Sequence, residues 1–338
     1  MGNNRLLEAF TQFHPENADQ LFNGEAALRP PDPRIELAPI KRVAIFAEAF
    51  LPKVDGVSKT AYLTLRYLKQ TGREVIVFAP DISPPCVADT PVIALPSLGM
   101  SAAPETRLAL PHPIVAHHLN QFKPDLIHLF SPALLSVSGM LVGRQNRIPV
   151  IANYQTDLPG YFEAYGYPLL SPIINDWLRF VHNGCHLTLV PSNFTLGTLR
   201  SHGYRRLRRW GRGVNNQQFN PSNFHPEWRA RLLNGRPADS LVCIYVGRLA
   251  NEKCVHLLRQ VVDVPGVALA IVGDGALRED LEQQFAGTPT MFTGYLVGEE
   301  LAQAFASADA FFFPGAYETF GQVVQEAMAS SLPSVVTE

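Results

Sequence analysis

The stretch Ala310-Phe-Phe-Phe-Pro-Gly-Ala-Tyr-Glu-Thr-Phe-Gly-Gln-Val-Val-Gln-Glu-Ala-Met-Ala329 contains a strand, a loop and a helix in close succession. The apolar run that ends at Phe313 predicts a buried strand, Pro314 begins the loop, and the residues after Gly321 predict a helix. Short apolar strands that alternate with helices are typical of a parallel sheet covered by helices on both faces. The stretch therefore predicts an α/β fold.

The same alternation recurs along most of the chain. In the first half we expect a helix at 58–70 and strands at 43–46, 75–79, 126–129, 150–153 and 187–190. In the second half we expect strands at 242–246, 267–272, 291–293 and 310–313, with helices from about Glu252, after Gly275, from Glu299 and after Gly321. Two such series predict two Rossmann-like, doubly wound domains.

Length and composition agree with two domains. The chain has 338 residues, of which 46% are hydrophobic, and this is enough to bury two cores. We expect four parts, which are an N-terminal extension at 1–40, a first domain at 41–210, a connection with a short helix at 211–240 and a second domain at 241–338. The extension combines a short amphipathic run, Leu6 to Phe13, with a Pro-rich segment at 29–34.

Charge and apolar content exclude several classes of protein. A formal net charge of −2 offers no basic surface that would release counterions from nucleic acid, so we expect no nucleic-acid partner. No run approaches the roughly 20 apolar residues of a membrane span, and the N-terminus lacks the apolar core of a signal peptide. The four cysteines form no C-x-x-C pair, which favours a reducing, cytoplasmic location.

Two carboxylates stand at the start of the last predicted helix. Glu318 precedes this helix and Glu326 lies inside it. Carboxylates accept strong hydrogen bonds from sugar hydroxyl groups, and free N–H groups at a helix start can hold a diphosphate that approaches closely beside Gly321. An isolated pair of this kind is more often a helix cap and a solvated helical residue.

The surrounding motifs favour the sugar-binding interpretation. The segment from Glu318 to Ala329 resembles the E-x7-E signature of the retaining glycosyltransferases of family four. Val246 to Lys253 resembles the strand–loop element of that family, Ile271 to Ala276 its next strand and turn, and Phe292 to Leu301 its base-side loop. The resemblance runs from about Arg42 to the last residue and implies a GT-B fold.

The resemblance also implies a donor site. Its catalytic members are Arg248 and Lys253, which hold the diphosphate of a nucleotide sugar, and Glu318, which contacts the transferred sugar, while Glu326 contacts the ribose. The remaining donor-binding residues that it implies are Gly56, Gly247, Gly273, Leu296, Thr319, Phe320 and Gly321. Two cations at a diphosphate stabilise the charge that grows as the leaving group departs, although outside such a motif they are more often solvated. We therefore expect no metal and no cofactor beyond the nucleotide-sugar co-substrate.

Two loops of the first half are expected on the acceptor side. Gln155 and Asp157 lie in a segment that resembles a Tyr-His-Thr-Asp element of relatives that glycosylate lipids, and Gln155 stands where many members carry His. An amide cannot exchange a proton near neutral pH, so Gln155 is expected to position the acceptor only. Asp157 either orients the acceptor or caps the following turn. Gly56 either faces the donor phosphate or is an ordinary turn residue before a helix N-cap at Ser58.

Two further patterns have simpler interpretations. Gly273-Asp274-Gly275 lacks the third glycine of a dinucleotide-binding fingerprint, which argues against a dehydrogenase. The segment Tyr204 to Arg212 carries five arginines, which suit either anionic lipid headgroups or a solvated edge, and the second interpretation is favoured because no long amphipathic helix accompanies them.

We therefore expect a retaining enzyme that passes a hexose from a nucleoside diphosphate, uridine rather than guanosine, to a lipid hydroxyl at the inner face of the membrane. A soluble sugar or sugar phosphate is the alternative acceptor. A donor-binding protein without activity is a further alternative, because relatives continue with more strand–helix pairs where this chain stops at Glu338, so the second domain is expected to be truncated. The sequence does not determine the sugar, the role of residues 1–40 or the oligomeric state.

Overall fold

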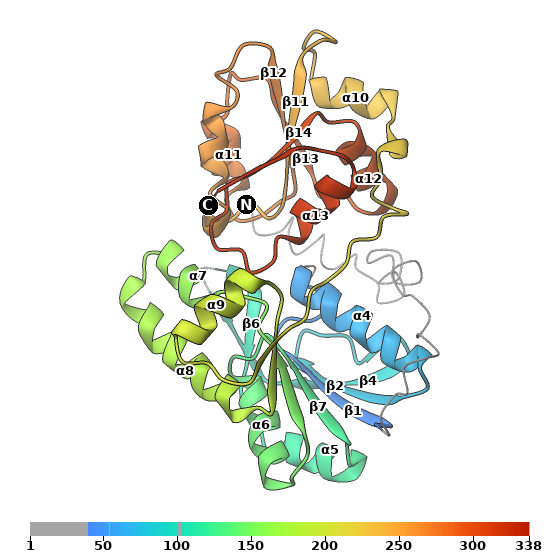
Figure 1. The fold of residues 1–338 in the computed structure, drawn as a ribbon, viewed down its shortest axis with the longest axis vertical. Coiled ribbons are helices and arrows are strands. Elements are labelled where there is room, and N and C mark those ends of the chain that lie inside the picture. The colour runs from blue at the N-terminus through green and yellow to red at the C-terminus, as the bar shows by residue number, and fades with distance from the viewer. Residues whose placement is uncertain (1–39, 54, 101–102, 338) are drawn as a thin grey trace. The chain divides into compact units, whose positions relative to one another are not determined.

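The computed structural model describes residues 40–53, 55–100 and 103–337 (Figure 1). Most of the predicted N-terminal extension, including the amphipathic run and the Pro-rich segment, lies outside these residues. The chain divides into two compact units, of which the first ends at Gly211 and the second begins at Arg212. Each unit is described by itself.

An eight-stranded sheet forms the centre of the first unit. Its strands lie in the order β10-β9-β8-β7-β1-β2-β4-β3, and every neighbouring pair is parallel except β3 with β4. The strands are β1 (Arg42–Ala47), β2 (Glu74–Pro80), β3 (Cys86–Val87), β4 (Thr90–Leu95), β7 (Leu126–Phe130), β8 (Val150–Asn153), β9 (Leu187–Val190) and β10 (Leu207–Arg209). A separate hairpin consists of β5 (Ser97–Met100) and β6 (Ala103–Ala109). All five strands predicted here are confirmed.

Helices cover both faces of this sheet because alternate strand residues point to opposite sides. In β1, Val43 and Ile45 pack in one apolar cluster with α4, whereas Ala44 and Phe46 pack in another with α5, α6 and α8. The helices are α4 (Gly56–Gln70), α5 (Ile114–Phe122), α6 (Leu135–Gln145), α7 (Leu158–Ala164), α8 (Ser171–Gly184) and α9 (Asn193–Ser201), with a 3₁₀ turn η2 (Pro168–Leu170).

The second unit contains a five-stranded parallel sheet in the order β13-β12-β11-β14-β15. Its strands are β11 (Leu241–Val246), β12 (Val267–Val272), β13 (Thr290–Gly294), β14 (Ala310–Phe313) and β15 (Ser334–Val336). Its helices are α10 (Pro226–Leu233), α11 (Arg278–Gln284), α12 (Gly298–Ala306) and α13 (Gln322–Ala329), with 3₁₀ turns η3 (Pro221–Asn223), η4 (Asn251–Lys253) and η5 (Val255–Gln260). The predicted α/β fold with two doubly wound sheets is confirmed.

Two local predictions are wrong. The helix expected from about Glu252 is replaced by the short turns η4 and η5, because Cys254 between them has a left-handed φ of 51°, which interrupts the helical hydrogen-bond pattern. The N-cap expected at Ser58 is instead Asp55, three residues earlier, and Ser58 completes a capping box with it.

Residues of the expected connection pack into the second unit. Phe219, Trp228, Leu232 and Leu233 belong to the apolar core around β11 and β12. Arg229 joins this segment to the sheet, since its Nη1 lies 2.6 Å from Asp309 Oδ2 and its Nη2 donates to the Ser240 carbonyl. Apolar burial therefore fixes the part of the connection that includes α10.

Two loops of the second unit approach each other at glycine residues. The backbone of Gly273, with a φ of 129°, lies so close to the loop after β11 that an added Cβ would stand 2.0 Å from the Gly247 carbonyl oxygen. Leu249 N–H donates to the Asp274 carbonyl and Leu277 N–H donates to the Leu249 carbonyl. Glycine at position 273 therefore allows the two backbones to hydrogen-bond directly.

We predict that Gly273→Ala lowers the free energy of unfolding of the second unit by about 3 kcal/mol or more, because it adds a backbone clash to an unfavourable φ. Gly266→Ala is the matched control, since Gly266 also has a positive φ of 78° but has open space around it. The control should cost only about 1 kcal/mol. Urea unfolding monitored by circular dichroism measures both, and equal losses would show that the contact with Gly247 is unimportant.

Candidate functional site

In the second unit, the first strand, β11, lies in the middle of the sheet with two strands on each side. β11 lies between β12 and β14, so the chain moves outward through β12 and β13 and then returns to the other side of β11 to form β14. The loops after β11 and β14 leave the same edge of the sheet in opposite directions, and ligands of doubly wound sheets bind at such a point. These two loops carry Arg248, Lys253 and Glu318.

Lys253 and Glu318 join the two loops. The Lys253 ammonium contacts Glu318 Oε1 in an ion pair, and Nζ also lies 5.4 Å from the centre of the Phe313 ring. Lys253 is buried and Glu318 is half-buried. The structure therefore brings together two of the three predicted catalytic residues, although they are far apart in sequence.

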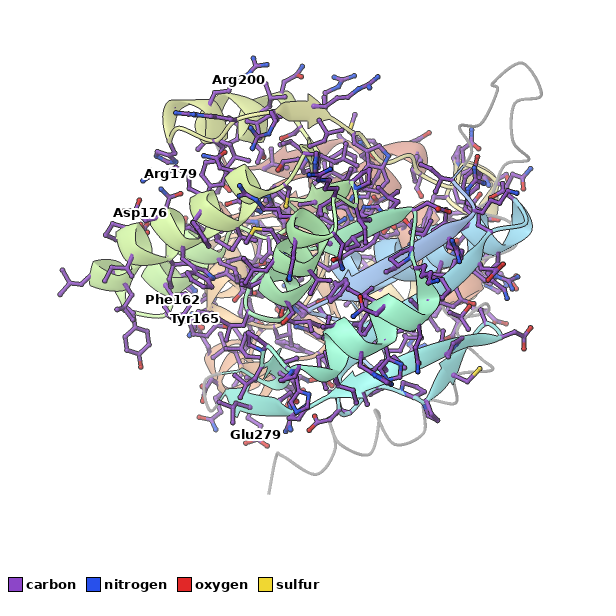
Figure 2. The ribbon with its side chains drawn as sticks, turned by 90° about the horizontal axis from the view of Figure 1, so that it is seen from below. Phe162, Tyr165, Asp176, Arg179, Arg200 and Glu279 are labelled. Atoms are coloured by element: carbon purple, nitrogen blue, oxygen red, sulfur yellow. The ribbon has the colours of Figure 1, made fainter. Side chains whose placement is uncertain are left out.

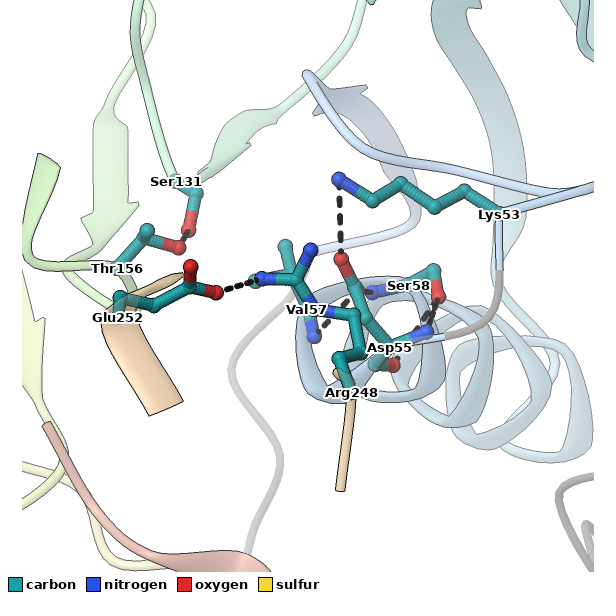
Figure 3. A network of polar contacts seen from close by, with 8 residues as sticks. All are labelled: Lys53, Asp55, Val57, Ser58, Ser131, Thr156, Arg248 and Glu252. Carbon is teal, nitrogen blue, oxygen red and sulfur yellow. Dashed lines mark hydrogen bonds and ion pairs between the residues drawn. The ribbon is translucent and has the colours of Figure 1, made fainter. Parts of the chain in front are cut away.

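Arg248 is held within its own loop by a residue that the sequence reasoning missed. Its Nη2 lies 2.5 Å from Oε1 of Glu252, whose side chain is fully buried (Figure 3). Beneath the loop, the buried Tyr245 hydroxyl donates to the Arg248 carbonyl at 2.9 Å. The two residues are four positions apart in the sequence, but this spacing indicates a pair only in a helix and Arg248 lies in a loop, so the sequence carried no clear signal.

Helix α13 begins beside Glu318 without a side-chain cap. Its N-cap is Gly321, which has a left-handed φ of 71°, and no acidic residue lies in its first turn. Glycine is favoured here by its φ, because other residues rarely adopt this conformation. Backbone N–H groups at the helix start therefore have no side-chain acceptor at the N-cap and can donate to an anion.

The other predicted donor residues have varied surroundings. Glu326 is buried in α13, Thr319 is buried before it, and the Arg212 guanidinium lies over the Phe320 ring at 5.1 Å. Leu296 belongs to the apolar core, so its side chain contributes packing. Gly247 and Gly273 form the backbone contact described above.

An apolar cavity of the second unit lies against other strand residues of the sheet. It has a volume of about 600 Å³ and is lined mainly by aliphatic and aromatic side chains that include Leu241, Leu258 and Val335. Among the described residues that line the cavity, Asp309 is the charged one. Its carboxylate already binds Arg229 and accepts from Val242 N–H. The charged loops, which can bind polar groups, are the better candidate site.

In the first unit, Gly56 opens helix α4 and is exposed. Asp55 Oδ1 accepts from the N–H groups of Val57 and Ser58, and Lys53 Nζ lies 3.4 Å from Asp55 Oδ2 (Figure 3). The start of this helix is thus occupied by a carboxylate of the chain itself.

Gln155 and Asp157 follow β8. Gln155 is buried beside Ser131 and His182, and Ser131 Oγ lies 3.3 Å from Thr156 Oγ1 (Figure 3). Asp157 is the N-cap of α7, where its Oδ1 accepts from Gly160 N–H at 3.2 Å, and burial raises the pKa of this carboxyl. The geometry shows capping by Asp157, which was one of its two expected roles.

Glu48 is a further residue that the sequence reasoning missed. It follows β1 and is buried, and its Oε1 accepts from the N–H groups of Ala133 and Ser136, each at 2.9 Å. These groups lie at the start of α6, directly after the neighbouring strand β7. Burial raises the pKa of Glu48 from 4.5 to about 7, against the opposing effect of these hydrogen bonds.

The arginine-rich segment forms an edge. The middle of this segment forms strand β10, which lies at the end of the sheet and pairs with β9 only. Arg208 and Arg209 of this strand are exposed. Charged side chains protect an edge strand from pairing with another chain. Among the described residues, no group of three or more His, Cys, Asp or Glu side chains is placed to hold a metal ion, and no helix has both the length and the apolarity to cross a membrane.

Comparison with known families accounts for both units. The family described as Glycosyltransferase Family 4 matches residues 54–218, and the family described as Glycosyl transferases group 1 matches residues 240–338. The chain is similar to the GDP-mannose-dependent alpha-mannosyltransferase of Mycobacterium tuberculosis, with 40% identity over 88% of this chain and 79% of the relative. It is also similar to the sulfoquinovosyl transferase SQD2 of Arabidopsis thaliana, with 37% identity over 87% of this chain and 59% of the relative.

Two more distant comparisons agree with these. The alpha-monoglucosyldiacylglycerol synthase of Acholeplasma laidlawii is 26% identical over 87% of this chain and 80% of the relative. The solved structure of a sucrose-phosphate synthase from Thermosynechococcus elongatus superposes with a TM-score of 0.65 and 21% identity, and the match covers 88% of this chain and 81% of that one. The second comparison shows the fold, which is GT-B.

We predict that Glu48→Gln makes the protein more stable than the wild type above pH 7. Because the carboxyl pKa of Glu48 is higher in the folded than in the unfolded state, its contribution is fully present below about pH 4.5 and is lost as the pH rises to about 7. The difference between variant and wild type should therefore grow by roughly 3 kcal/mol across this range.

Asp125→Asn is a control of opposite sign. Asp125 accepts hydrogen bonds from the backbone N–H groups of Arg42 and Lys41, and these hold its carboxyl pKa below the usual value. This variant should be less stable than the wild type at neutral pH and should approach it in acid. Urea unfolding at a series of pH values measures both variants, and a pH-independent effect of Glu48→Gln would contradict the assignment.

Proposed function

Since the chain belongs to the family 4 glycosyltransferases and is a hexosyltransferase, we propose that it transfers a hexose from a nucleoside diphosphate to a lipid hydroxyl, with retention of anomeric configuration. The observation that carries this proposal is the contact between Lys253 and Glu318, which joins the loops after β11 and β14. A cation and a carboxylate lie together where a doubly wound sheet binds ligands. The donor carries both complementary groups, an anionic diphosphate and a polyhydroxylated sugar.

In this proposal the donor replaces contacts that the protein makes with itself. The diphosphate binds Lys253 and Arg248, which in the structure are held by Glu318 and Glu252. Glu318 then accepts hydrogen bonds from hydroxyl groups of the sugar. Glu252 remains buried below and fixes the direction of the Arg248 guanidinium, so it is a positioning residue.

The start of α13 adds a further anion-binding group. Its backbone N–H groups lie beside Glu318 and have no side-chain cap, so they support binding of the diphosphate. Glu326, buried on the same helix, is assigned to the ribose. By contrast, the starts of α4, α6 and α7 in the first unit are occupied by Asp55, Glu48 and Asp157.

Catalysis follows from charge development on the donor. As the bond between the sugar C1 and the phosphate oxygen breaks, negative charge grows on the diphosphate, and Arg248 and Lys253 stabilise it. The acceptor hydroxyl oxygen bonds to C1 on the same face, and its proton passes to the leaving phosphate oxygen. Gln155 takes no proton in this scheme, which suits an amide.

The names of relatives guide the choice of donor and acceptor. The sequence analysis favours a uridine donor, whereas the mycobacterial relative is named for GDP-mannose, so both nucleotides belong in a binding test. The Acholeplasma relative is named for a diacylglycerol product, which supports a lipid acceptor for this chain. A protein that acts on lipids in this way works peripherally at a membrane surface.

We predict that Arg248→Ala and Lys253→Ala each weaken nucleoside-diphosphate binding about tenfold or more, since each removes a charge-assisted contact. Each should also reduce the rate of sugar transfer about a hundredfold or more. Isothermal titration calorimetry with UDP and GDP measures the first effect, and release of nucleoside diphosphate from the sugar donor measures the second.

Arg259→Ala is the matched control, because Arg259 lies in the same unit but pairs with the exposed Asp263. This variant should behave like the wild type. If neither UDP nor GDP at saturating concentration binds the wild type, the protein has no donor site at these loops and the proposed function fails.

We predict at least about tenfold faster transfer to diacylglycerol or phosphatidylinositol in mixed micelles than to a free sugar or a sugar phosphate. Thin-layer chromatography of products from a radiolabelled donor measures all four acceptors under the same conditions. Micelles without the lipid acceptor control for hydrolysis of the donor. Equal transfer to the soluble acceptors would refute the lipid assignment and leave the enzyme class intact.

A further inference from the structure

The helical hairpin of α7 and α8 presents large apolar side chains at its tip. We call Tyr167, Leu169, Leu170 and Ile173 the apolar tip, and Leu169 is 86% exposed and Ile173 64% exposed. The segment 164–175, which contains the tip, has no charged residue. Several large apolar side chains exposed within one short segment are typical of an interaction site.

The apolar surface continues along α8. Ile173, Trp177 and Phe180 are exposed and follow one another at spacings of three and four residues, so they lie on one side of the helix. Leu178 and Val181 are buried on the other side. The helix therefore has an inner apolar face that packs on its own unit and an outer one that extends from the apolar tip.

Trp177 connects the outer face to the edge of the first sheet at which the parallel strands end. Trp177 Nε1 donates to the Ala133 carbonyl at 3.1 Å, and Ala133 lies in the loop after β7 that Glu48 also binds. The carboxyl ends of the parallel strands meet at this edge. A surface at this position can bring a lipid hydroxyl to the first unit without removing the lipid from its bilayer.

Basic residues lie next to the apolar surface. The segment 177–213 contains seven arginines and no aspartate or glutamate. Within it, the side chains of Arg200, Arg205, Arg208 and Arg209 are exposed, and we call these four the basic flank. Arg179 of α8 donates to the His202 carbonyl at 3.2 Å, so α8 lies directly beside this segment.

Figure 2 shows the same neighbourhood from another side. The labelled side chains of α7, α8 and α9, which are Phe162, Tyr165, Asp176, Arg179 and Arg200, lie along one side of the first unit. Aromatic side chains with one polar end suit the interfacial zone of a bilayer, and arginines suit anionic headgroups.

Charge and shape favour a membrane over another protein molecule. A second copy that docked through the same surface in a symmetric dimer would bring basic flanks of equal charge together. A side chain as exposed as Leu169 makes few contacts with its own unit and projects from the surface. Projecting apolar groups beside cations can enter the headgroup layer of an anionic bilayer.

We propose that the apolar tip and the basic flank together form a docking surface for an anionic phospholipid bilayer. The inference rests on the proposed function, because a lipid acceptor supplies the reason for the enzyme to work at a bilayer. The apolar tip contributes burial of apolar area, and the basic flank makes binding depend on anionic lipid and on salt.

Vesicle flotation with the full chain tests the apolar tip. The vesicles contain equal amounts of phosphatidylglycerol and phosphatidylcholine, and the test variant carries Leu169→Ser with Ile173→Ser. Its partition coefficient should fall about tenfold or more, because two aliphatic side chains no longer enter the interface. Leu98→Ser is the matched control, since Leu98 is 60% exposed in β5, and it should bind like the wild type.

The basic flank is tested with Arg208→Gln and Arg209→Gln. Each should reduce binding to the mixed vesicles roughly fivefold and leave binding to pure phosphatidylcholine vesicles unchanged. Added salt should weaken the wild type more than the doubly substituted variant. If the wild type binds vesicles equally well with or without anionic lipid and with or without added salt, the basic flank has no role and the two-part surface is refuted.

Separate readouts distinguish this inference from the proposed function. Hydrolysis of GDP-mannose and UDP-glucose without vesicles should be the same for the wild type and the Leu169→Ser, Ile173→Ser variant, which also shows that the variant is folded. If the wild type does not float, or floats no better than this variant, the docking surface is refuted while donor hydrolysis still reports on the enzyme. A dimer that sedimentation detects and this variant abolishes would assign the surface to a second copy instead.

Discussion

The ion pair between Lys253 and Glu318 connects the two loops of the second unit that carry the proposed donor site. These loops leave neighbouring parallel strands in opposite directions, so the sheet itself cannot hold them together. The Lys253–Glu318 pair joins the two loops, while the Arg248–Glu252 pair and the Tyr245 hydroxyl fix the loop after β11 internally. These contacts involve Arg248, Lys253 and Glu318, which are the side chains that the proposed nucleotide-sugar donor would bind.

In the first unit the strand order also reverses at the first strand, with β1 between β2 and β7, but a carboxylate of the chain itself lies at this point. Glu48 follows β1, and its side chain accepts hydrogen bonds at the start of α6, after the adjacent strand β7. The N–H groups of Ala133 and Ser136 at this place already donate to Glu48, so they do not offer themselves to a diphosphate. This difference gives a physical reason to place the diphosphate in the second unit and the acceptor in the first, as the proposed function does.

The strands and the fold class could be predicted because apolar runs between Gly and Pro breakers reflect local burial. Features that depend on contacts distant in sequence could not. The helix expected at Glu252 is interrupted at Cys254. The buried position of Glu48 was not predicted, because a single Glu after a strand has no distinctive spacing. The apolar tip was also missed, since outward and inward apolar residues of α8 look alike in a sequence.

The sequence by itself determined two doubly wound units, the family motifs and the residues Arg248, Lys253, Glu318 and Glu326 of the expected donor site. The two units follow from hydrophobic periodicity, and the donor-site residues are those that the resemblance to the family implies. Only the tertiary structure decided that Lys253 meets Glu318, that Glu252 holds Arg248, and that Gly273 is needed for backbone contact with Gly247. Such contacts join separate strands and loops, so they exist only once the sheet has brought those loops to one edge.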